Sequence, residues 1–302
     1  METGDLQKYR GQWGGGIQTA DGRHEEMWWS EPNRALAGSA WARWRFRLDV
    51  RHYFILRFWG KFLRSRGAAT LPRVIDFGCG SGGTTMNFSH VFWVPIQGVD
   101  IFETQLKVAR QNAQALGSAC TFERLGEGGS IPVPDASIDV VLSLDVLGHV
   151  PDIPAVLNEF RRVLKPGGAV LLFTESTYSD GDRSIMARLA RSGADMMTVV
   201  PEHISLFPRE RLEELFGAAG FTMLERVSAN VGHFFFFPKD YVMLLRGRAG
   251  FTGWKMLASF WNRLSKLTPF YPKPLDTLRL ALTLMFGRRA YGTSYFYYLR
   301  KN

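Results

Sequence analysis

The chain has little cysteine and no long apolar run. Its 302 residues include two cysteines, Cys79 and Cys120, which disfavours a fold held by disulfides and predicts a reducing compartment. No stretch approaches the ~20 consecutive apolar residues of a membrane-spanning helix, since residues 278–286 form only a short run that Arg279 interrupts. The first ten residues are polar and show no signal-peptide pattern. Together these absences predict a cytoplasmic protein.

The sequence is rich in apolar and aromatic residues, and its charge is unevenly distributed. Hydrophobic residues make up 46% of the chain and aromatic residues 14%, enough for a large core and for aromatic side chains at a site or partner surface. Residues 1–73 carry 13 basic and 7 acidic side chains, residues 74–237 carry 12 and 19, and residues 238–302 carry 12 and 2. The basic flanks are either solvated surface or a binding site for an anionic partner, such as a membrane surface, a nucleic acid or an acidic substrate.

A glycine-rich turn follows the first clear strand pattern. The apolar residues of 74–77 favour a strand, and the segment Gly78-Cys79-Gly80-Ser81-Gly82-Gly83 can turn sharply and bring backbone N–H groups close to a ligand. Its glycines also satisfy the G-x-G-x-x-G spacing of dinucleotide-binding proteins. Asp100 ends the next apolar run, where a carboxylate can accept both hydroxyls of a ribose. The motif alone therefore allows a nicotinamide dinucleotide as well as another nucleoside cofactor.

Strand and helix patterns alternate from residue 73 onward. This alternation predicts an α/β fold with a doubly wound, seven-stranded, mostly parallel sheet, and such sheets bind ligands at the carboxyl ends of their strands. Residues 32–66 predict one or two basic amphipathic helices, whose aromatic stripe either packs on the main domain or contacts a membrane or the substrate. The expected strands span residues 73–77, 96–100, 120–125, 138–144, 169–174, 221–227 and 291–299, and the expected helices 83–92, 103–116, 153–164 and 206–219.

Five sequence blocks indicate which cofactor the glycine-rich turn binds. In order, they read VIDFGCGSGG, IQGVDI, GSIPVPDASIDVVLSLDVLGHV, LNEFRRVLKPGGAVLLF and EHISLFPRERLEELFGAAGF. Together they resemble the class I S-adenosylmethionine-dependent methyltransferases, and more narrowly the small-molecule branch that includes the quinone-biosynthesis methyltransferases. The resemblance covers residues 73–227 and the last expected strand. It implies a Rossmann-like methyltransferase core and S-adenosyl-L-methionine as the cofactor.

The resemblance also implies roles for residues around the turn. It places Asp76 near the methionine ammonium group of the cofactor and Asp100 at the ribose diol. Glu127 stands where the family often has an acidic residue beside the adenine amino group, and an ordinary loop carboxylate is the alternative. The cofactor-binding residues implied in this way are Asp76, Gly78, Gly80, Gly82, Asp100, Ile101, Glu127, Gly128 and Leu144.

Two histidines and two residues beyond the fifth strand are candidates for the reaction itself. Methyl transfer from a sulfonium depends on alignment, and a hydroxyl acceptor also benefits from a general base. His149 is the first candidate for that base and His203 the second, and each could instead be a structural histidine. Glu175 and Tyr178 are expected to line the acceptor pocket.

The segment around His149 departs from the related enzymes. Quinone-type relatives commonly carry Glu-His here, whereas Gly148 precedes His149 in this chain, which puts any step that depends on that carboxylate in doubt. Asp145 and His149 are four residues apart and could share a helix face, but two residues are poor support for a metal site. No metal is expected.

The regions outside the core are expected to determine the acceptor. We expect an N-terminal helical cap over residues 1–70, the cofactor-binding core over 71–230, an aromatic and basic insert over 231–290, and the last strand over 291–302. Residues 1–30 should be mostly irregular. The insert is a lid over the acceptor, a membrane-contacting patch or a nucleic-acid surface, and the third is disfavoured because no recognised RNA-binding module is present.

These inferences predict an enzyme that transfers a methyl group from S-adenosyl-L-methionine to a small-molecule acceptor. The acceptor should be hydrophobic or linked to a lipid or glycan, with oxygen favoured over carbon or nitrogen as the attacked atom. A cofactor-binding scaffold without catalysis is the second hypothesis, motivated by Gly148 and the insert. An RNA methyltransferase is the third. Peripheral attachment to an anionic membrane is the alternative to a purely cytoplasmic location.

Overall fold

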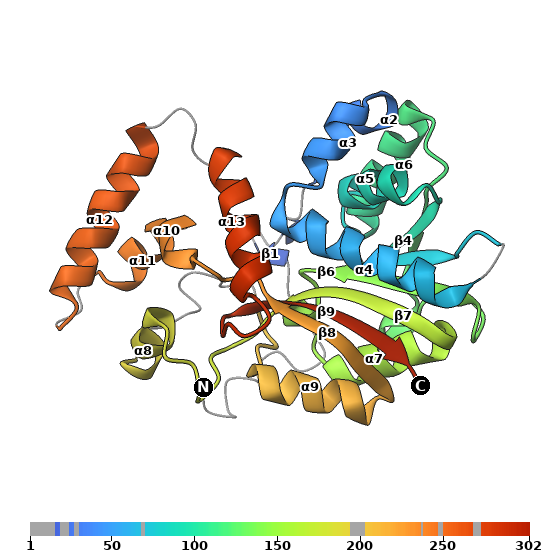
Figure 1. The fold of residues 1–302 in the computed structure, drawn as a ribbon. Helices are drawn as coiled ribbons and strands as arrows, with labels where there is room; N and C mark the ends of the chain where they lie inside the picture. Colours follow the sequence, from blue (N-terminus) through green and yellow to red (C-terminus); the bar gives the residue numbers. More distant parts are fainter. Residues whose placement is uncertain are drawn as a thin grey trace.

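A seven-stranded sheet forms the centre of the molecule. The computed structural model describes residues 16–18, 24–26, 30–67, 70–193, 203–236, 238–246, 250–267 and 273–302. The strand order is β5-β4-β3-β6-β7-β9-β8, and β9 runs antiparallel to both of its neighbours (Figure 1). This arrangement confirms the predicted α/β fold with a mostly parallel sheet. The strands are β3 (Val74–Phe77), β4 (Ile96–Asp100), β5 (Thr121–Arg124), β6 (Ile138–Leu144), β7 (Leu164–Glu175), β8 (Phe221–Ser228) and β9 (Ser294–Lys301).

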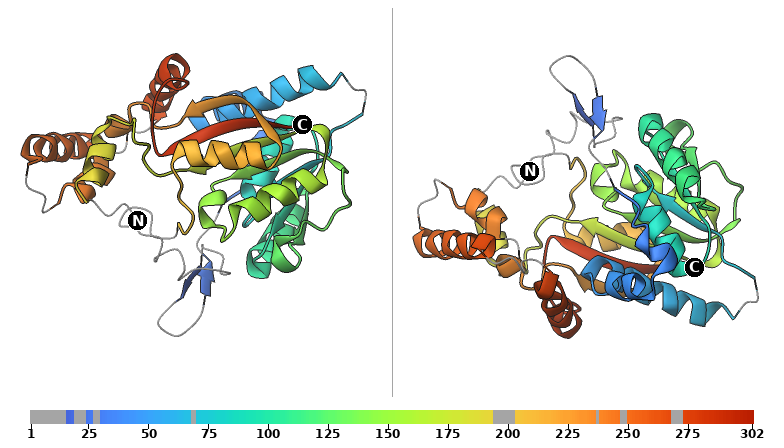
Figure 2. Two further views of the ribbon diagram at one scale, coloured as in Figure 1. Left: turned by 90° about the horizontal axis from the view of Figure 1, so that it is seen from below. Right: turned by 90° about the horizontal axis from the view of Figure 1, so that it is seen from above.

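Helices cover both faces of this sheet (Figure 2). The first face carries α4 (Val50–Arg66), α5 (Gly83–Phe92) and α6 (Glu103–Leu116), and the second carries α7 (Ile153–Val163) and α9 (Arg209–Ala218). Successive side chains of a strand point to opposite faces, so Leu142 of β6 belongs to the first core and Val141 to the second. Burial on both faces explains why the central strands read as continuous apolar runs.

Three helices lie between residue 30 and the sheet, where the sequence predicted one or two. They are α2 (Ala35–Gly38), α3 (Ala40–Phe46) and α4, and the extra breaks arise because Ser39 and Asp49 act as N-caps. The aromatic residues of α4 pack on the main domain, with Phe54 stacked 5.2 Å from Phe296 and Trp59 stacked 4.3 Å from Phe92. In α3, by contrast, Trp41 and Trp44 are exposed. The structure therefore confirms the packing alternative for the α4 part of the stripe.

Other element boundaries also differ from the sequence prediction. Strand β7 begins at Leu164 and not at residue 169 as predicted, because Leu164 already adopts an extended conformation at the end of α7. The N-terminal region includes a short antiparallel pair, β1 (Gly16–Gln18) and β2 (His24–Glu26), although it was expected to be irregular. The rest of residues 1–29 lies outside the described residues.

A helical insert separates β8 from β9, and a short helix packs beside it; the described part of the insert forms four helices. The insert contains α10 (His233–Phe236), α11 (Pro238–Leu244), α12 (Thr252–Leu267) and α13 (Lys273–Phe286), and the neighbouring helix is α8 (Ile185–Arg191). A small core that includes Leu189, Phe234, Tyr241 and Ala258 joins α8 to α10, α11 and α12. Among the described residues, no helix is both long and apolar enough to cross a membrane.

The insert lies at the ligand-binding edge of the sheet. It begins after the end of β8 and returns at Ser294, the first residue of β9, which pairs with Glu175 at the carboxyl end of β7. Because β3, β4, β6 and β7 are parallel, their carboxyl ends share this edge. The chain thus places the aromatic and basic insert on the same side of the sheet as the glycine-rich turn.

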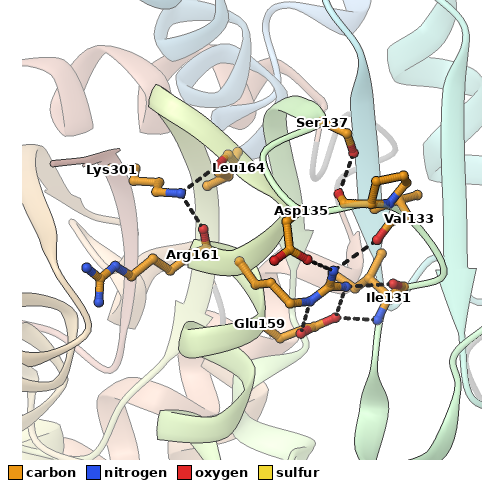
Figure 3. Close-up of polar contacts among 10 residues, drawn as sticks. Ile131, Val133, Asp135, Ser137, Glu159, Arg161, Leu164 and Lys301 are labelled. Carbon is orange, nitrogen blue, oxygen red and sulfur yellow. Dashed lines mark hydrogen bonds and ion pairs between the residues drawn. The ribbon is translucent and has the colours of Figure 1, made fainter.

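One arginine fixes the loop that leads into β6. Arg162 on α7 forms ion pairs with Asp135 at 2.6 Å and Glu159 at 2.7 Å, and it donates hydrogen bonds to the carbonyl oxygens of Ile131 and Val133 (Figure 3). A guanidinium group has five N–H donors in one plane, so Arg162 can bind these carboxylates and carbonyl oxygens together. The loop before β6 is therefore tied to α7 and has a fixed path into the sheet.

Candidate active site

The glycine-rich turn joins β3 to α5 and is anchored to β4. The backbone N–H groups of Gly78 and Cys79 both donate to the carbonyl oxygen of Val99, at 2.8 and 3.1 Å. Gly78 has a left-handed φ of +78°, and a Cβ atom there would lie 2.4 Å from Cγ2 of Val146. Such a contact is too short for any side chain, so glycine is required by both conformation and packing.

Gly82 is also required by both its conformation and its packing. Its φ is +78°, and a Cβ atom would lie 2.7 Å from the ring of Phe122. Ser30 lies over the far end of the turn, where its N–H donates to Oγ of Ser81 at 2.8 Å and its carbonyl accepts from the same hydroxyl at 2.9 Å. A Cβ atom on Gly83 would lie 2.4 Å from the Ser30 carbonyl oxygen. The turn is thus packed between Phe122 on one side and the backbone of Ser30 on the other.

Asp100 stands at the tip of β4, where it was predicted. Its carboxylate accepts the N–H of Gly80 at 2.8 Å and the N–H of Phe102 at 3.0 Å. These bonds go to different oxygens and hold the side chain at the end of β4, where it lines the smaller pocket. From this position a carboxylate can accept the hydroxyls of a ribose.

Asp76 is a buried carboxyl group just before the turn. It is 3% exposed, and Oγ1 of Thr85 donates to its Oδ2 at 2.6 Å. Burial raises the pKa of Asp76 to about 7, the Thr85 hydrogen bond opposes that rise, and the charge of Asp100 adds to it. A nearby cation would restore the ionised form, so this site fits an ammonium group.

Two pockets flank the glycine-rich turn. The smaller has a volume of about 70 Å³ and the larger about 330 Å³. Gly78, Gly80 and Asp145 belong to the walls of both. The smaller pocket is also lined by Phe77, Asp100, Ile101, Phe102, Gln105, Leu125, Val146 and His149. The larger pocket is also lined by Ser30, Arg51, His52, Asp76, Cys79, Thr84, Phe88, Leu144 and Phe173.

A chain of charged side chains begins at the wall shared by the pockets. Arg51 on α4 forms an ion pair with Asp145, and its guanidinium carbon lies 4.5 Å from the centre of the Phe173 ring. Burial and the neighbouring Glu175 raise the pKa of Asp145 well above its usual value, although Arg51 lowers it. Burial also raises the pKa of Glu175, but hydrogen bonds from His203 and Asp145 lower it to about 2. The two carboxyl groups thus lie side by side in a buried site, with Arg51 beside Asp145 and His203 beside Glu175.

His149 and His203 lie next to each other at the end of this network. Their ring centres are 4.3 Å apart, and Nε2 of His203 lies 3.5 Å from Oε2 of Glu175. The carbonyl oxygen of Gly148 accepts the N–H of Ile204 at 2.8 Å, which holds the His203 segment in place. A Cβ atom on Gly148 would lie 2.4 Å from Cδ2 of His203. The His203 ring thus fills the space beside the backbone where a side chain at position 148 would begin.

The expectation that Asp145 and His149 share a helix face is wrong. Asp145 has a left-handed φ of +59° and precedes the short 3₁₀ turn η2 (Leu147–His149), so no regular helix spans both residues. Its N–H is instead bound by the carbonyl oxygen of Phe173 at 3.0 Å. In the part of the chain that the structure describes, no group of three His, Cys, Asp or Glu residues could hold a metal ion.

Several predicted site residues lie apart from the pockets. Glu127 and Gly128 are exposed on the short turn η1 (Glu127–Gly129) and line neither pocket. Tyr178 packs against the small core of α8 and the insert. Gly82 supports the turn without lining either pocket. The adenine contact of Glu127 and the acceptor contact of Tyr178 stay predictions.

The sequence prediction allowed a substrate contact for residues 32–66 but did not single out Arg51 and His52 of α4, which line the larger pocket. Nδ1 of His52 lies 3.0 Å from the carbonyl oxygen of Phe46, and because a carbonyl can only accept, Nδ1 carries the hydrogen. Burial lowers the pKa of His52, which favours a neutral ring whose Nε2 is an acceptor. The available signal was local: His52 interrupts the aromatic spacing of its helix at the position where α4 passes the larger pocket.

The family of methyltransferase domains matches residues 41–226 of this chain. The ubiquinone/menaquinone biosynthesis C-methyltransferase UbiE of Shewanella piezotolerans is 28% identical over 208 residues, which cover 63% of this chain and 83% of that protein. A Galdieria sulphuraria structure assigned as a sarcosine dimethylglycine methyltransferase has a TM-score of 0.51 at 21% identity, covering 82% of this chain and 84% of that one.

A second solved structure with a similar fold contains a cofactor product. Phosphoethanolamine N-methyltransferase 2 of Haemonchus contortus, in complex with phosphomonomethylethanolamine and S-adenosylhomocysteine, has a TM-score of 0.50 at 21% identity. The match covers 80% of this chain and 53% of that one. At this identity the two structural likenesses concern the fold, whereas the family match spans most of the chain. The chain therefore belongs to the methyltransferase-domain family and is an S-adenosylmethionine-dependent methyltransferase.

Proposed function

We propose that this enzyme methylates a hydroxyl oxygen on a small, partly apolar acceptor bound in the larger pocket. The observation that carries this proposal is the position of Arg51, whose cationic guanidinium lies at the pocket wall against Phe173. A fixed cation stabilises the negative charge that develops on an oxygen nucleophile and disfavours a cationic amine. Phe88 and Phe173 supply apolar surface for the remainder of such an acceptor.

The residues around the turn fit the cofactor. Asp76 would hold the methionine ammonium group, Asp100 the ribose hydroxyls, and the backbone of Gly78 and Gly80 would lie against the methionine and ribose. Ile101 would contact the nucleoside in the smaller pocket, and Leu144 the methionine side in the larger one. When bound, S-adenosylmethionine supplies an electrophilic methyl group. The role of the protein is then to align the acceptor oxygen with that methyl group and to exclude water.

The acceptor proton needs a base, and two histidines are candidates. His52 belongs to the larger pocket, and its hydrogen bond to the Phe46 carbonyl leaves Nε2 as the acceptor nitrogen. His149 belongs to the smaller pocket, together with Asp100 and Ile101, and is therefore on the cofactor side. We assign the base to His52. His149 would contact the cofactor in the smaller pocket, and His203 with Glu175 would hold the His149 ring in place.

The attacked atom can be tested by product analysis. Purified enzyme is incubated with S-adenosylmethionine carrying a deuterated methyl group and with phenols, hydroxyquinones or phosphoethanolamine, and each product is examined by mass spectrometry and NMR. Oxygen-linked methyl groups on the phenolic acceptors are expected. Methylation of ring carbon, as in the reaction named for the Shewanella relative, or of phosphoethanolamine nitrogen, would overturn the oxygen assignment.

The base assignment has a separate test. Replacing His52 with Gln should lower kcat by roughly 100-fold with little change in cofactor affinity, because only proton removal is lost. His149→Gln is the matched comparison and should raise the cofactor Kd. The reverse pattern, with kcat lost in His149→Gln alone, would move the base to His149.

A further inference from the structure

Helix α12 has two apolar faces, of which one is packed. On the packed side, Ala258 is fully buried, Nε1 of Trp261 donates to the carbonyl oxygen of Phe235 at 2.7 Å, and Trp254 lies edge-on to Phe234 at 5.3 Å. These residues occupy one stripe of the helix, because they are spaced by three and four. The packing of α12 onto α10 and α11 therefore uses this stripe.

A second side of α12 is apolar and exposed. Met256 is 69% exposed, Phe260 62% and Leu257 45%. At 100° per residue, these positions fall within a single arc of about 100° that lies beside the packed stripe, with Leu257 nearest to it and Met256 farthest from it. Figures 1 and 2 place α12 at the outer limit of the molecule, far from the sheet. We call Met256, Leu257 and Phe260 the outer face of α12.

Basic side chains border this outer face. Lys255 and Arg263 are exposed on α12, and the sequence of the helix contains no Asp or Glu. Arg246, just after α11, is also exposed. A second exposed apolar strip occurs on the neighbouring helix α13, where Leu278 is 50% and Met285 71% exposed. Apolar residues bordered by cations, with no acid on the helix, form an amphipathic element suited to an anionic interface.

The charge and the apolar character of the outer face distinguish among three possible binding partners. A second copy of the chain would bring the same cations against each other across a two-fold interface. A nucleic acid would satisfy the cations, but of the three outer-face side chains Phe260 alone offers a ring for base stacking, whereas Met256 and Leu257 are aliphatic. An anionic lipid bilayer satisfies both features, since the apolar side chains enter the headgroup boundary while Lys255 and Arg263 contact lipid phosphates.

We propose that α12 docks the enzyme on the surface of an anionic lipid bilayer through its outer face. The insert shares the sheet edge that holds the active site, so docking brings that edge toward the bilayer. A methyl acceptor dissolved in the membrane would then lie near the pocket entrance. The docking does not depend on the proposed oxygen acceptor and can be tested without any acceptor.

The test measures binding of the full chain to vesicles by co-sedimentation. Wild-type protein should bind phosphatidylcholine vesicles containing about 30% phosphatidylglycerol, and raising the salt to about 0.5 M should weaken that binding several-fold. Met256→Ser/Phe260→Ser should reduce the partition coefficient roughly tenfold or more by removing apolar contact, and Lys255→Glu/Arg263→Glu should reduce it similarly by reversing the charge.

Trp93→Ser provides the matched control. Trp93 is 68% exposed but lies at the end of α5, so its loss removes apolar surface elsewhere and should leave vesicle binding unchanged. Cofactor affinity confirms that each variant is folded. Equal binding of wild type and both α12 variants would overturn the proposal. So would equal binding to pure phosphatidylcholine, a dimer that the α12 variants abolish in the absence of lipid, or binding to single-stranded RNA in place of vesicles.

Discussion

At the scale of single residues, the structure explains why position 148 is a glycine. Related enzymes commonly have Glu at this position, so the sequence alone allowed the interpretation that glycine here reflects a loss of catalysis. In the structure, the His203 ring lies against Gly148, and the carboxylate of Glu175 lies beside His203. The acidic group next to the histidine pair therefore comes from β7 and not from position 148. Glycine is what this arrangement requires.

Asp76 leads to a prediction about pH. Its pKa of about 7 means that the carboxylate which would bind the cofactor ammonium is increasingly protonated below neutrality. Affinity for S-adenosylmethionine should therefore fall as the pH falls, by roughly 20-fold between pH 7.5 and pH 5.5. Isothermal titration calorimetry across this range measures the effect. Asp76→Asn should bind weakly with a flat pH profile, and an equally steep profile in that variant would contradict the assignment.

The packing at Gly78 leads to a second prediction. Gly78→Ala places a Cβ atom against Val146 and should weaken cofactor binding at least about tenfold. Gly117→Ala is the matched control, because Gly117 also has a positive φ of +59° but has no atom within 4 Å of the Cβ position. It should cost about 1 kcal/mol of stability without changing affinity.

A double substitution separates steric conflict from backbone strain at Gly78. Adding Val146→Ala to Gly78→Ala removes the methyl groups that conflict with the new Cβ atom. Part of the cofactor affinity should return in calorimetry, because only the strain of a positive φ remains. No recovery at all would show that the conformation of Gly78, and not its contact with Val146, controls the turn.

At the scale of elements, Glu225 links α4 and the end of the insert to β8. Its 5% exposed carboxylate is paired with Arg57 at 3.1 Å, with Lys61, and with Arg288 at 2.8 Å. Glu225→Gln should lower the free energy of unfolding by about 1–3 kcal/mol, since three cations lose their shared partner. Glu103→Gln is the control: Glu103 also pairs with an arginine, but at an exposed site, and should have little effect.

The effect of Glu225→Gln should depend on pH. Burial opposes ionisation of Glu225, but Lys61 and Arg288 hold its pKa below the usual value. A depressed carboxyl pKa contributes stability above the unfolded pKa and loses it as the pH falls through the folded value. The difference between wild type and variant in urea denaturation should therefore shrink in acid. A constant difference from pH 7 to pH 3 would contradict this account.

Sequence patterns located most helices because the signals were local. The predicted bounds of α5 and α6 agree with the structure, and α7 ends one residue earlier than predicted. Gly82 before α5 and the left-handed Gly117 after α6 mark these ends in the sequence itself. The N-terminal helices were merged because the apolar pattern continued across their caps.

At the scale of the whole molecule, the sequence predicted the residues around the glycine-rich turn but not the ion pair that α4 contributes to the site. Asp76, Gly78, Gly80 and Asp100 belong to local motifs, and the structure brings them together around the turn. The ion pair of Arg51 with Asp145 joins residues 94 positions apart. It depends on where α4 crosses the sheet, which no local pattern specifies.

The insert should be separable from cofactor binding. Asn230 accepts the N–H groups of Thr293 and Ser294 at 2.8 and 2.7 Å, so the two ends of the insert lie together. Replacing residues 231–290 with Gly-Gly should leave the cofactor Kd within about threefold, because none of the insert residues that the structure describes lines either pocket. Calorimetry measures this, and thermal unfolding should show reduced stability from the loss of Arg288. Complete loss of cofactor binding would assign the insert to the active site.

The wall shared by the two pockets has a consequence for inhibitor design. Gly78, Gly80 and Asp145 border both pockets, so a molecule that joins a nucleoside part to an acceptor-like part must bridge this wall. Two of its three members are glycines, which present backbone and little bulk. A short, slim linker would gain the affinity of both parts at once, and a donor group on it could bind Asp145. The acceptor-like part of such a molecule would lie beside Arg51 and His52, which line the larger pocket.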